Sequence, residues 1–79
     1  MEYSTQKLQA LRAAIGRNIH DARIHRKVLL NRLSGMTGVS SELLDRYELG
    51  KNEIRLEEIL KIACALKVKA HSLLNDDIK

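Results

Sequence analysis

The chain has 79 residues, a formal net charge of +4 and one cysteine, and it contains no Phe, Trp or Pro. This length fits one domain with a small core. Leu, Ile, Val and Ala must fill that core, which favours packed helices over a β-sandwich. One cysteine excludes an internal disulfide, and neither a membrane span nor a secretory signal is visible in the sequence. We therefore expect a cytoplasmic domain without a membrane segment.

The first predicted helix has an apolar stripe whose members step by 3, 4, 4 and 3 residues: Leu8, Leu11, Ile15, Ile19 and Ala22. This spacing is typical of an amphipathic helix, and Ser4 or Thr5 can cap its start. Gly16 lowers the stability of a helix by about 1 kcal/mol relative to Ala. It predicts a division into a helical extension over residues 1–14 and a first core helix near 15–26. The stripe before Gly16 either packs inward or forms part of a dimer seam.

Two short helices joined by a glycine turn are predicted next, near 30–36 and 41–48. Gly38 falls where the turn requires a positive φ, and Ser40 can cap the helix that follows. Small and apolar residues fit the facing sides of the two helices: Leu33, Ser34, Val39, Leu44 and Tyr47. Such a frame presents its second helix to a DNA major groove.

The remainder of the chain predicts two more helices. Gly50 is a left-handed stop after the 41–48 helix. A helix beginning near residue 56 has a predicted inner stripe of Leu56, Ile59, Leu60, Ala63 and Leu66. A short helix near 70–75 is expected to bury Leu73 and Leu74, and residues 76–79 form a polar tail.

Positive charge is concentrated in the first helical region. Residues 12–32 hold six bases and one acid, a net of +5, whereas residues 33–66 hold four bases and six acids, a net of −2. A basic face favours an anionic partner such as nucleic acid, although it can also serve only to keep the protein in solution.

From about Ile15 to Asn75 the chain resembles the Cro and phage-repressor family, also called XRE-type. The resemblance lies in the order and spacing of short motifs: Ile15-Gly16, Arg23 with Arg26, Leu33-Ser34, Gly38-Val39-Ser40, Arg46-Tyr47-Glu48, Gly50-Lys51, and Leu56-Glu57 leading into Leu60-Lys61-Ile62-Ala63 and Ala65-Leu66. It implies an all-α, five-helix lambda-repressor-like helix-turn-helix domain over residues 15–75. Such a domain binds double-stranded operator DNA as a homodimer and regulates transcription.

Two positions depart from the family pattern. Leu29-Leu30 replaces a common Thr-Gln, so a cap worth about 1 kcal/mol and a DNA contact are missing, and Asn31 is the nearest polar substitute. Ile54-Arg55 replaces a frequent Pro-Ser, so a second cap is missing too.

We predict DNA contacts from nine residues: Asn31, Ser40, Ser41, Glu42, Leu43, Asp45, Arg46, Lys51 and Asn52. Arg46 can hold guanine O6 and N7, Glu42 and Asp45 can accept from cytosine N4, and Leu43 can touch a thymine methyl group. Structural alternatives stay open, because the two acids can simply cap and solvate the helix. Arg46 can instead pair with Glu42, for about 0.3–0.5 kcal/mol.

Phosphate contacts are the expected role of the other polar positions. Ser40 and Ser41 can bind a phosphate or a base edge, and the family resemblance implies that Lys51 and Asn52 meet phosphates. Their alternative is an ordinary polar loop. Arg26 and Lys27 can meet the flanking DNA backbone.

Metal, cofactor and enzyme functions are not expected. His20 and His25 are five residues apart and do not share a helix face, and one cysteine cannot complete a zinc site. Cys64 is expected to be a small buried hydrophobe.

The sequence thus favours a DNA-binding transcriptional regulator, a repressor that acts as a homodimer. The alternative is a protein-interaction module on the same fold, a co-regulator or antitoxin-like protein. An acidic 41–48 helix and an apolar patch of Leu29, Leu30 and Leu43 favour that alternative.

Overall fold

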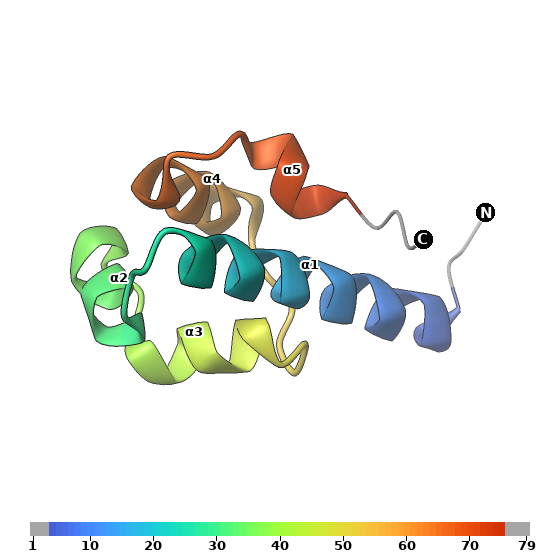
Figure 1. The fold of residues 1–79 in the computed structure, drawn as a ribbon. Coiled ribbons are helices and arrows are strands. Elements are labelled where there is room, and N and C mark those ends of the chain that lie inside the picture. The colour runs from blue at the N-terminus through green and yellow to red at the C-terminus, as the bar shows by residue number, and fades with distance from the viewer. Residues whose placement is uncertain (1–3, 76–79) are drawn as a thin grey trace.

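The computed structural model describes residues 4–75, which form five helices and no strand. The helices are α1 (Thr5–His25), α2 (Leu30–Thr37), α3 (Ser41–Glu48), α4 (Leu56–Leu66) and α5 (Ala70–Leu74). In Figure 1, α1 runs through the middle, with α3 on one side and α4 and α5 on the other. The predicted all-α, five-helix fold is confirmed. Within residues 4–75, no helix is both long enough and apolar enough to cross a membrane.

α1 is one uninterrupted helix, so the predicted division at Gly16 is wrong. Gly16 is buried where α1 crosses α3, and a Cβ at this position would lie 2.7 Å from the Glu48 carbonyl oxygen and closer still to that of Tyr47. The glycine therefore permits a close approach of two backbones. Ser4 caps the helix as predicted, because its Oγ accepts from the backbone N–H of Lys7 at 3.2 Å.

The predicted extension is the first half of α1 and the residues that precede it. Side chains 4–10 are exposed, including Leu8, whereas Leu11 packs against the core. The prediction that this stripe packs inward is therefore confirmed for Leu11 and wrong for Leu8. Residues 1–3 of the extension and the predicted polar tail over 76–79 lie outside the described residues.

The turn between α2 and α3 has the predicted form. Gly38 has a φ of 78°, in the left-handed region, and the buried Thr37 closes the turn by accepting from the backbone N–H of Val39 at 3.2 Å. The Ser40 Oγ then accepts from the Leu43 N–H at 3.1 Å and caps α3. These bonds fix the angle at which α3 leaves the turn.

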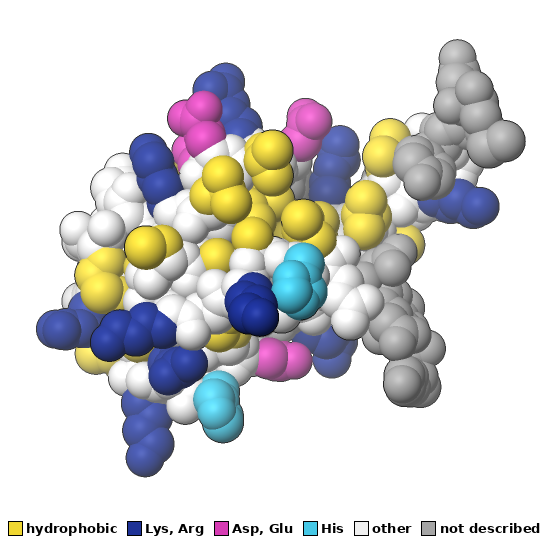
Figure 2. Space-filling view, turned by 90° about the horizontal axis from the view of Figure 1, so that it is seen from above, with side chains coloured by type: hydrophobic (Ala, Val, Ile, Leu, Met, Phe, Trp, Pro, Cys, Tyr) yellow, Lys and Arg dark blue, Asp and Glu magenta, His cyan; other side chains and the backbone are white. Residues whose placement is uncertain are grey.

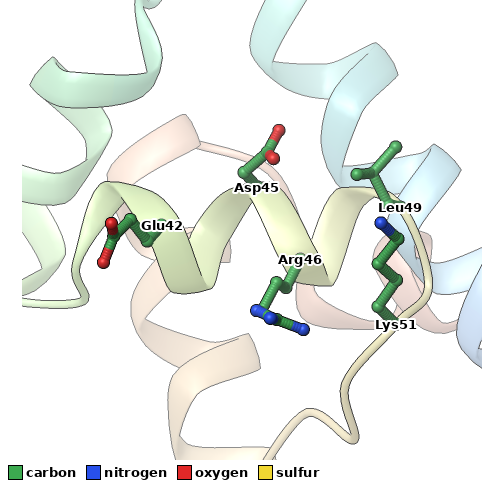
Figure 3. Close-up of a pocket in the computed structure, with 5 residues that line it drawn as sticks. All are labelled: Glu42, Asp45, Arg46, Leu49 and Lys51. Atoms are coloured by element: carbon green, nitrogen blue, oxygen red, sulfur yellow. The ribbon is translucent and has the colours of Figure 1, made fainter.

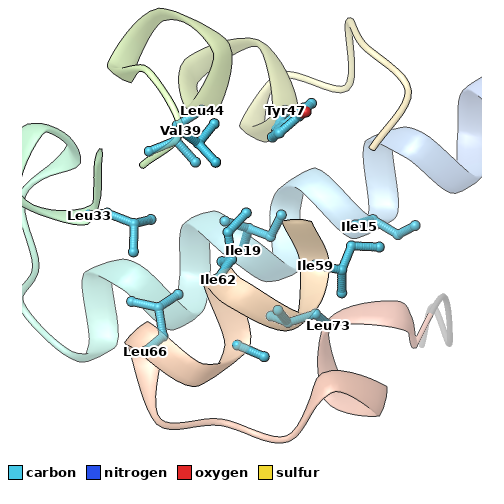
Figure 4. Close-up of a cluster of buried hydrophobic side chains, with 11 residues drawn as sticks. Ile15, Ile19, Leu33, Val39, Leu44, Tyr47, Ile59, Ile62, Leu66 and Leu73 are labelled. Atoms are coloured by element: carbon cyan, nitrogen blue, oxygen red, sulfur yellow. The ribbon is translucent and has the colours of Figure 1, made fainter. Parts of the chain in front are cut away.

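The core lies between α1 and the other four helices, as Figure 4 shows. Its buried apolar members are Ile15, Ile19, Leu33, Val39, Leu44, Tyr47, Ile59, Ile62, Ala63, Leu66 and Leu73. The inner faces predicted for α2 and α3 are part of this core, apart from Ser34, which is half-buried.

The inner stripe predicted for α4 is partly wrong. Leu56 and Leu60 are 63% and 52% exposed, Ile62 is buried in their place, and Cys64 is exposed rather than buried. Apolar residues cover more than half of this helix, with Glu57, Glu58 and Lys61 gathered on one side, so its sequence does not determine which of the apolar residues face inward. The packing of α4 against α1, α2 and α5 determines it instead.

α5 ends one residue earlier than predicted. Its five residues bury Leu73, but Leu74 remains 38% exposed. The end of this helix is held to α1, because the Asn18 side-chain amide donates to the carbonyl oxygens of Leu73 at 2.9 Å and Asn75 at 2.6 Å.

Candidate nucleic-acid interface

One face of α3 points away from the rest of the domain. Glu42, Asp45, Arg46 and Leu49 follow the i, i+3, i+4, i+7 spacing of a single helix face. All four are exposed, and together with Lys51 they line a shallow hollow (Figure 3). We call these five residues the α3 outer face. In Figure 3, Asp45 and Arg46 point toward opposite edges of this face.

The α3 outer face contains four of the nine predicted DNA contacts. Ser40 is next to it, but its Oγ is already used in capping α3. Ser41 is half-buried, Asn31 lies on α2 outside the hollow, and Asn52 is half-buried in the loop after Lys51.

Leu43 is not the outward apolar residue that its position predicted. It is half-buried and packs against the core, as does Leu30. The exposed apolar side chain of the α3 outer face is Leu49, which is 57% exposed. Helical spacing from Glu42 would have identified Leu49, although it lies one residue beyond the end of α3.

A partly buried ion pair attaches α3 to α1. Arg23 Nε donates to Glu48 Oε2 at 2.6 Å and its Nη2 donates to Oε1 at 3.1 Å, while His20 Nδ1 lies 2.9 Å from Oε1. The Glu48 side chain is 6% exposed. Burial alone would raise the pKa of Glu48, but the hydrogen bonds from Arg23 and His20 lower it below the ordinary value. The same pair raises the pKa of Arg23, chiefly through the hydrogen bond to Glu48.

This ion pair changes the charge that α3 presents to solvent. The segment 41–48 has a net charge of −2 in sequence, but the Glu48 carboxylate is neutralised inside the protein by Arg23. Arg23 Nη1 also donates to the Val28 carbonyl oxygen at 2.9 Å, just before α2 begins. One guanidinium therefore positions α3 and the start of α2 together.

A second partly buried contact fixes α3 to α4. The Tyr47 hydroxyl donates to the Glu58 carboxylate, and burial, with the Glu58 hydrogen bond second, raises the pKa of Tyr47 to about 12. α3 is thus fixed from both sides, and its outer face is presented on a rigid helix.

The structural alternative for Arg46 is not realised. Both ion pairs found among residues 4–75 involve Glu48, and none joins Arg46 to Glu42. Glu42 and Asp45 do not cap α3 either, since Ser40 does. The two helix caps predicted to be missing are indeed absent. Leu29 at α2 and Arg55 at α4 make no side-chain capping bond.

Sequence reasoning missed a groove between α1 and α3. Arg17, His20 and Asp21 line it together with Asp45 and Leu49. Arg17 is exposed there, which brings an α1 cation beside the α3 outer face. The sequence contained no signal for this, because the crossing of α1 and α3 at Gly16 creates the proximity.

Arg26 is used within the fold. Its Nη2 donates to the Lys67 carbonyl oxygen at 3.0 Å, which ties the end of α1 to the turn between α4 and α5. This bond occupies part of a side chain that was predicted to meet the DNA backbone. Across residues 4–75, no group of three His, Cys, Asp or Glu side chains could hold a metal ion.

Comparison with known proteins places this geometry in a family. The sequence profile of the helix-turn-helix family matches residues 19–73. The fold is similar to the crystal structure of the restriction-modification controller protein C.AhdI from Aeromonas hydrophila, with a TM-score of 0.76 and 22% identity over 78% of this chain and 94% of that one. A search of curated protein sequences gives no match. Because the family profile covers more than half of the chain, the protein belongs to the XRE-type helix-turn-helix family.

Proposed function

We propose that the protein is a DNA-binding transcription regulator that inserts the outer face of α3 into the major groove. The observation that carries this proposal is the exposed Arg46, not paired with Glu42, on a helix that partly buried contacts fix to α1 and α4. A rigid helix with an available guanidinium can hold guanine O6 and N7 with two hydrogen bonds. Family membership supports the same function.

The remaining contacts divide by role. Lys51 supplies a phosphate contact at the end of the α3 outer face, with Asn52 beside it, and Arg17 supplies one from α1. Asn31 meets the backbone from α2, and Ser40 and Ser41 lie where α3 enters the groove. Phosphate contacts provide affinity, and the base contacts of α3 provide sequence choice.

The regulator is proposed to act as a homodimer that represses by occluding a promoter. Figure 2 shows apolar side chains gathered on the face formed by α4 and α5, which supports a second copy as partner. The exposed large apolar residues of these two helices are Leu56, Leu60 and Leu74. Glu57 and Lys61 lie beside them on α4. Two antiparallel α4 helices related by a two-fold axis at Leu60 would bring Glu57 of one copy near Lys61 of the other. Sedimentation of Leu60→Lys beside the wild type tests this, and an unchanged dimer would exclude this interface.

Selection of bound duplexes from a random DNA library tests the function itself. The wild type should enrich one motif, and Arg46→Ala should lose the preference for guanine at one position of that motif. Lys69→Ala is the matched control, because it removes one positive charge next to α5, which lies across α1 from α3 (Figure 1). Enrichment that survives Arg46→Ala unchanged would show that Arg46 does not read bases.

A protein-interaction module is the second candidate. Leu29 is 70% exposed at the start of α2, and two carboxylates lie on the α3 outer face. However, Leu30 and Leu43 pack against the core, which reduces the predicted apolar patch to Leu29. A protein that enriches no duplex in the selection, and whose Leu29→Ser variant loses a protein partner, would favour this candidate.

A further inference from the structure

We propose that Glu42 selects a cytosine in each DNA half-site, by accepting a hydrogen bond from its exocyclic amino group, and that methylation of this amino group weakens binding. The inference rests on the proposed DNA-binding function and adds to it the base that this carboxylate reads. Glu42 is an acid on a surface where negative charge opposes DNA binding.

The position of Glu42 is that of a base-reading residue. It is exposed in the first turn of α3, and the N-terminal residues of a recognition helix are the ones that contact base edges. Its carboxylate is in neither of the ion pairs found in residues 4–75, and the capping bond at this end of α3 is made by Ser40. The acid also interacts favourably with the positive end of the helix dipole. That benefit concerns stability, and it can be measured separately from base choice.

Chemistry restricts the base that a carboxylate can face. An ionised carboxylate only accepts hydrogen bonds. In the major groove guanine presents the acceptors N7 and O6, and thymine presents the acceptor O4, so both repel it. The adenine N6 donor lies between two acceptors, its own N7 and O4 of the paired thymine, whereas the cytosine N4 donor has an acceptor on one side only, O6 of the paired guanine. Cytosine is therefore the base that Glu42 tolerates best.

Asp45 provides a matched comparison on the same helix. It has the same charge and is exposed, but it lines the groove between α1 and α3 with Arg17 and His20. In Figure 3 it points toward the edge of the α3 outer face opposite to Arg46. Asp45 therefore lies at the edge of the α3 outer face that borders α1. Removing it should raise the general affinity for DNA while the cytosine preference stays with Glu42. Loss of that preference in Asp45→Ala would assign the cytosine to Asp45 and overturn the inference.

Library selection with four proteins tests the proposal: the wild type, Glu42→Ala, Glu42→Gln and Asp45→Ala. The wild type and Asp45→Ala should enrich cytosine at one position of each half-site. In Glu42→Ala the preference for cytosine over thymine at that position should fall about tenfold. Glu42→Gln should shift the preference towards adenine, because an amide can both accept from N6 and donate to N7. A helix-stabilising role alone would produce no such shift, and circular dichroism verifies that each variant is folded.

Modified duplexes test the amino group itself. N4-methylcytosine at the selected position places a methyl group where the groove-facing N–H was, and it should weaken wild-type binding about tenfold. 5-Methylcytosine retains the N4 donor, and Glu42→Ala should tolerate N4-methylcytosine. A cytosine preference that survives Glu42→Ala, or wild-type binding indifferent to N4-methylcytosine, would overturn this inference alone. Failure of the wild type to enrich any sequence would overturn both it and the proposed function.

Discussion

Replacing Gly16 with alanine should destabilise the protein, although alanine is the better helix former by about 1 kcal/mol. The added Cβ would lie 2.7 Å from the Glu48 carbonyl oxygen and closer still to that of Tyr47. Both atoms belong to the α3 backbone, which the Arg23 ion pair and the Tyr47 contact hold in place. Overpacking against atoms that cannot move aside costs up to about 3 kcal/mol. Subtracting the helix propensity leaves a net loss of about 2 kcal/mol.

Urea unfolding followed by circular dichroism measures this loss, with an expected fall in melting temperature of about 8–16 °C as a second readout. Gly35→Ala is the matched control, because a Cβ at this α2 position meets no atom within 4 Å. This variant should be more stable by about 0.5–1 kcal/mol. A Gly16→Ala variant as stable as the wild type would refute the close approach of α1 and α3.

Three further predictions concern the elements that hold α3. Gly38→Ala should cost about 1–2 kcal/mol, because a φ of 78° is strained for any residue with a Cβ; an unchanged melting temperature would contradict this. The pKa of Glu48 is lowered in the folded protein, so the stability that it contributes is present above its unfolded-state pKa and is lost as the pH falls through the folded-state pKa. Urea unfolding at a series of pH values from neutral to acidic should show this loss of unfolding free energy in the wild type and a smaller loss in Glu48→Gln. Equal losses in the two proteins would argue against the ion pair. The pKa of Tyr47 is raised from 10.0 to about 12, so its contribution is complete below pH 10 and declines as the pH rises towards 12; the prediction fails if Tyr47→Phe shows the same alkaline decline.

Local sequence signals predicted the central motif well. The bounds of α3, the Ser40 cap, and the positive φ of Gly38 and Gly50 all agree with the structure. Each depends on residues within a few positions of one another, where capping geometry and glycine conformation act directly. For the same reason the missing cap at Leu29 was predictable.

Features that depend on packing between distant segments were not predictable. Propensity alone assigned Gly16 as a break, because the α3 backbone that it accommodates is some 30 residues away in sequence. The rotation of α4, which exposes Leu60 and Cys64, is set by its neighbours. Arg23 and Glu48 were both part of the recognised motif pattern, but nothing in their spacing indicated that they pair. Consequently the outward acids and Arg46 were identified, whereas the groove formed with α1 was missed.

The salt dependence of DNA binding tests the central claim most directly. A duplex selected from the library would be titrated with wild-type protein by fluorescence anisotropy between about 50 and 200 mM salt. The two cations proposed to meet phosphates, Lys51 and Arg17, predict a log–log slope of at least about −2 for each subunit bound. An affinity that stays flat across this range, or no binding at the lowest salt, would contradict the claim that α3 and its flanking cations form a DNA interface.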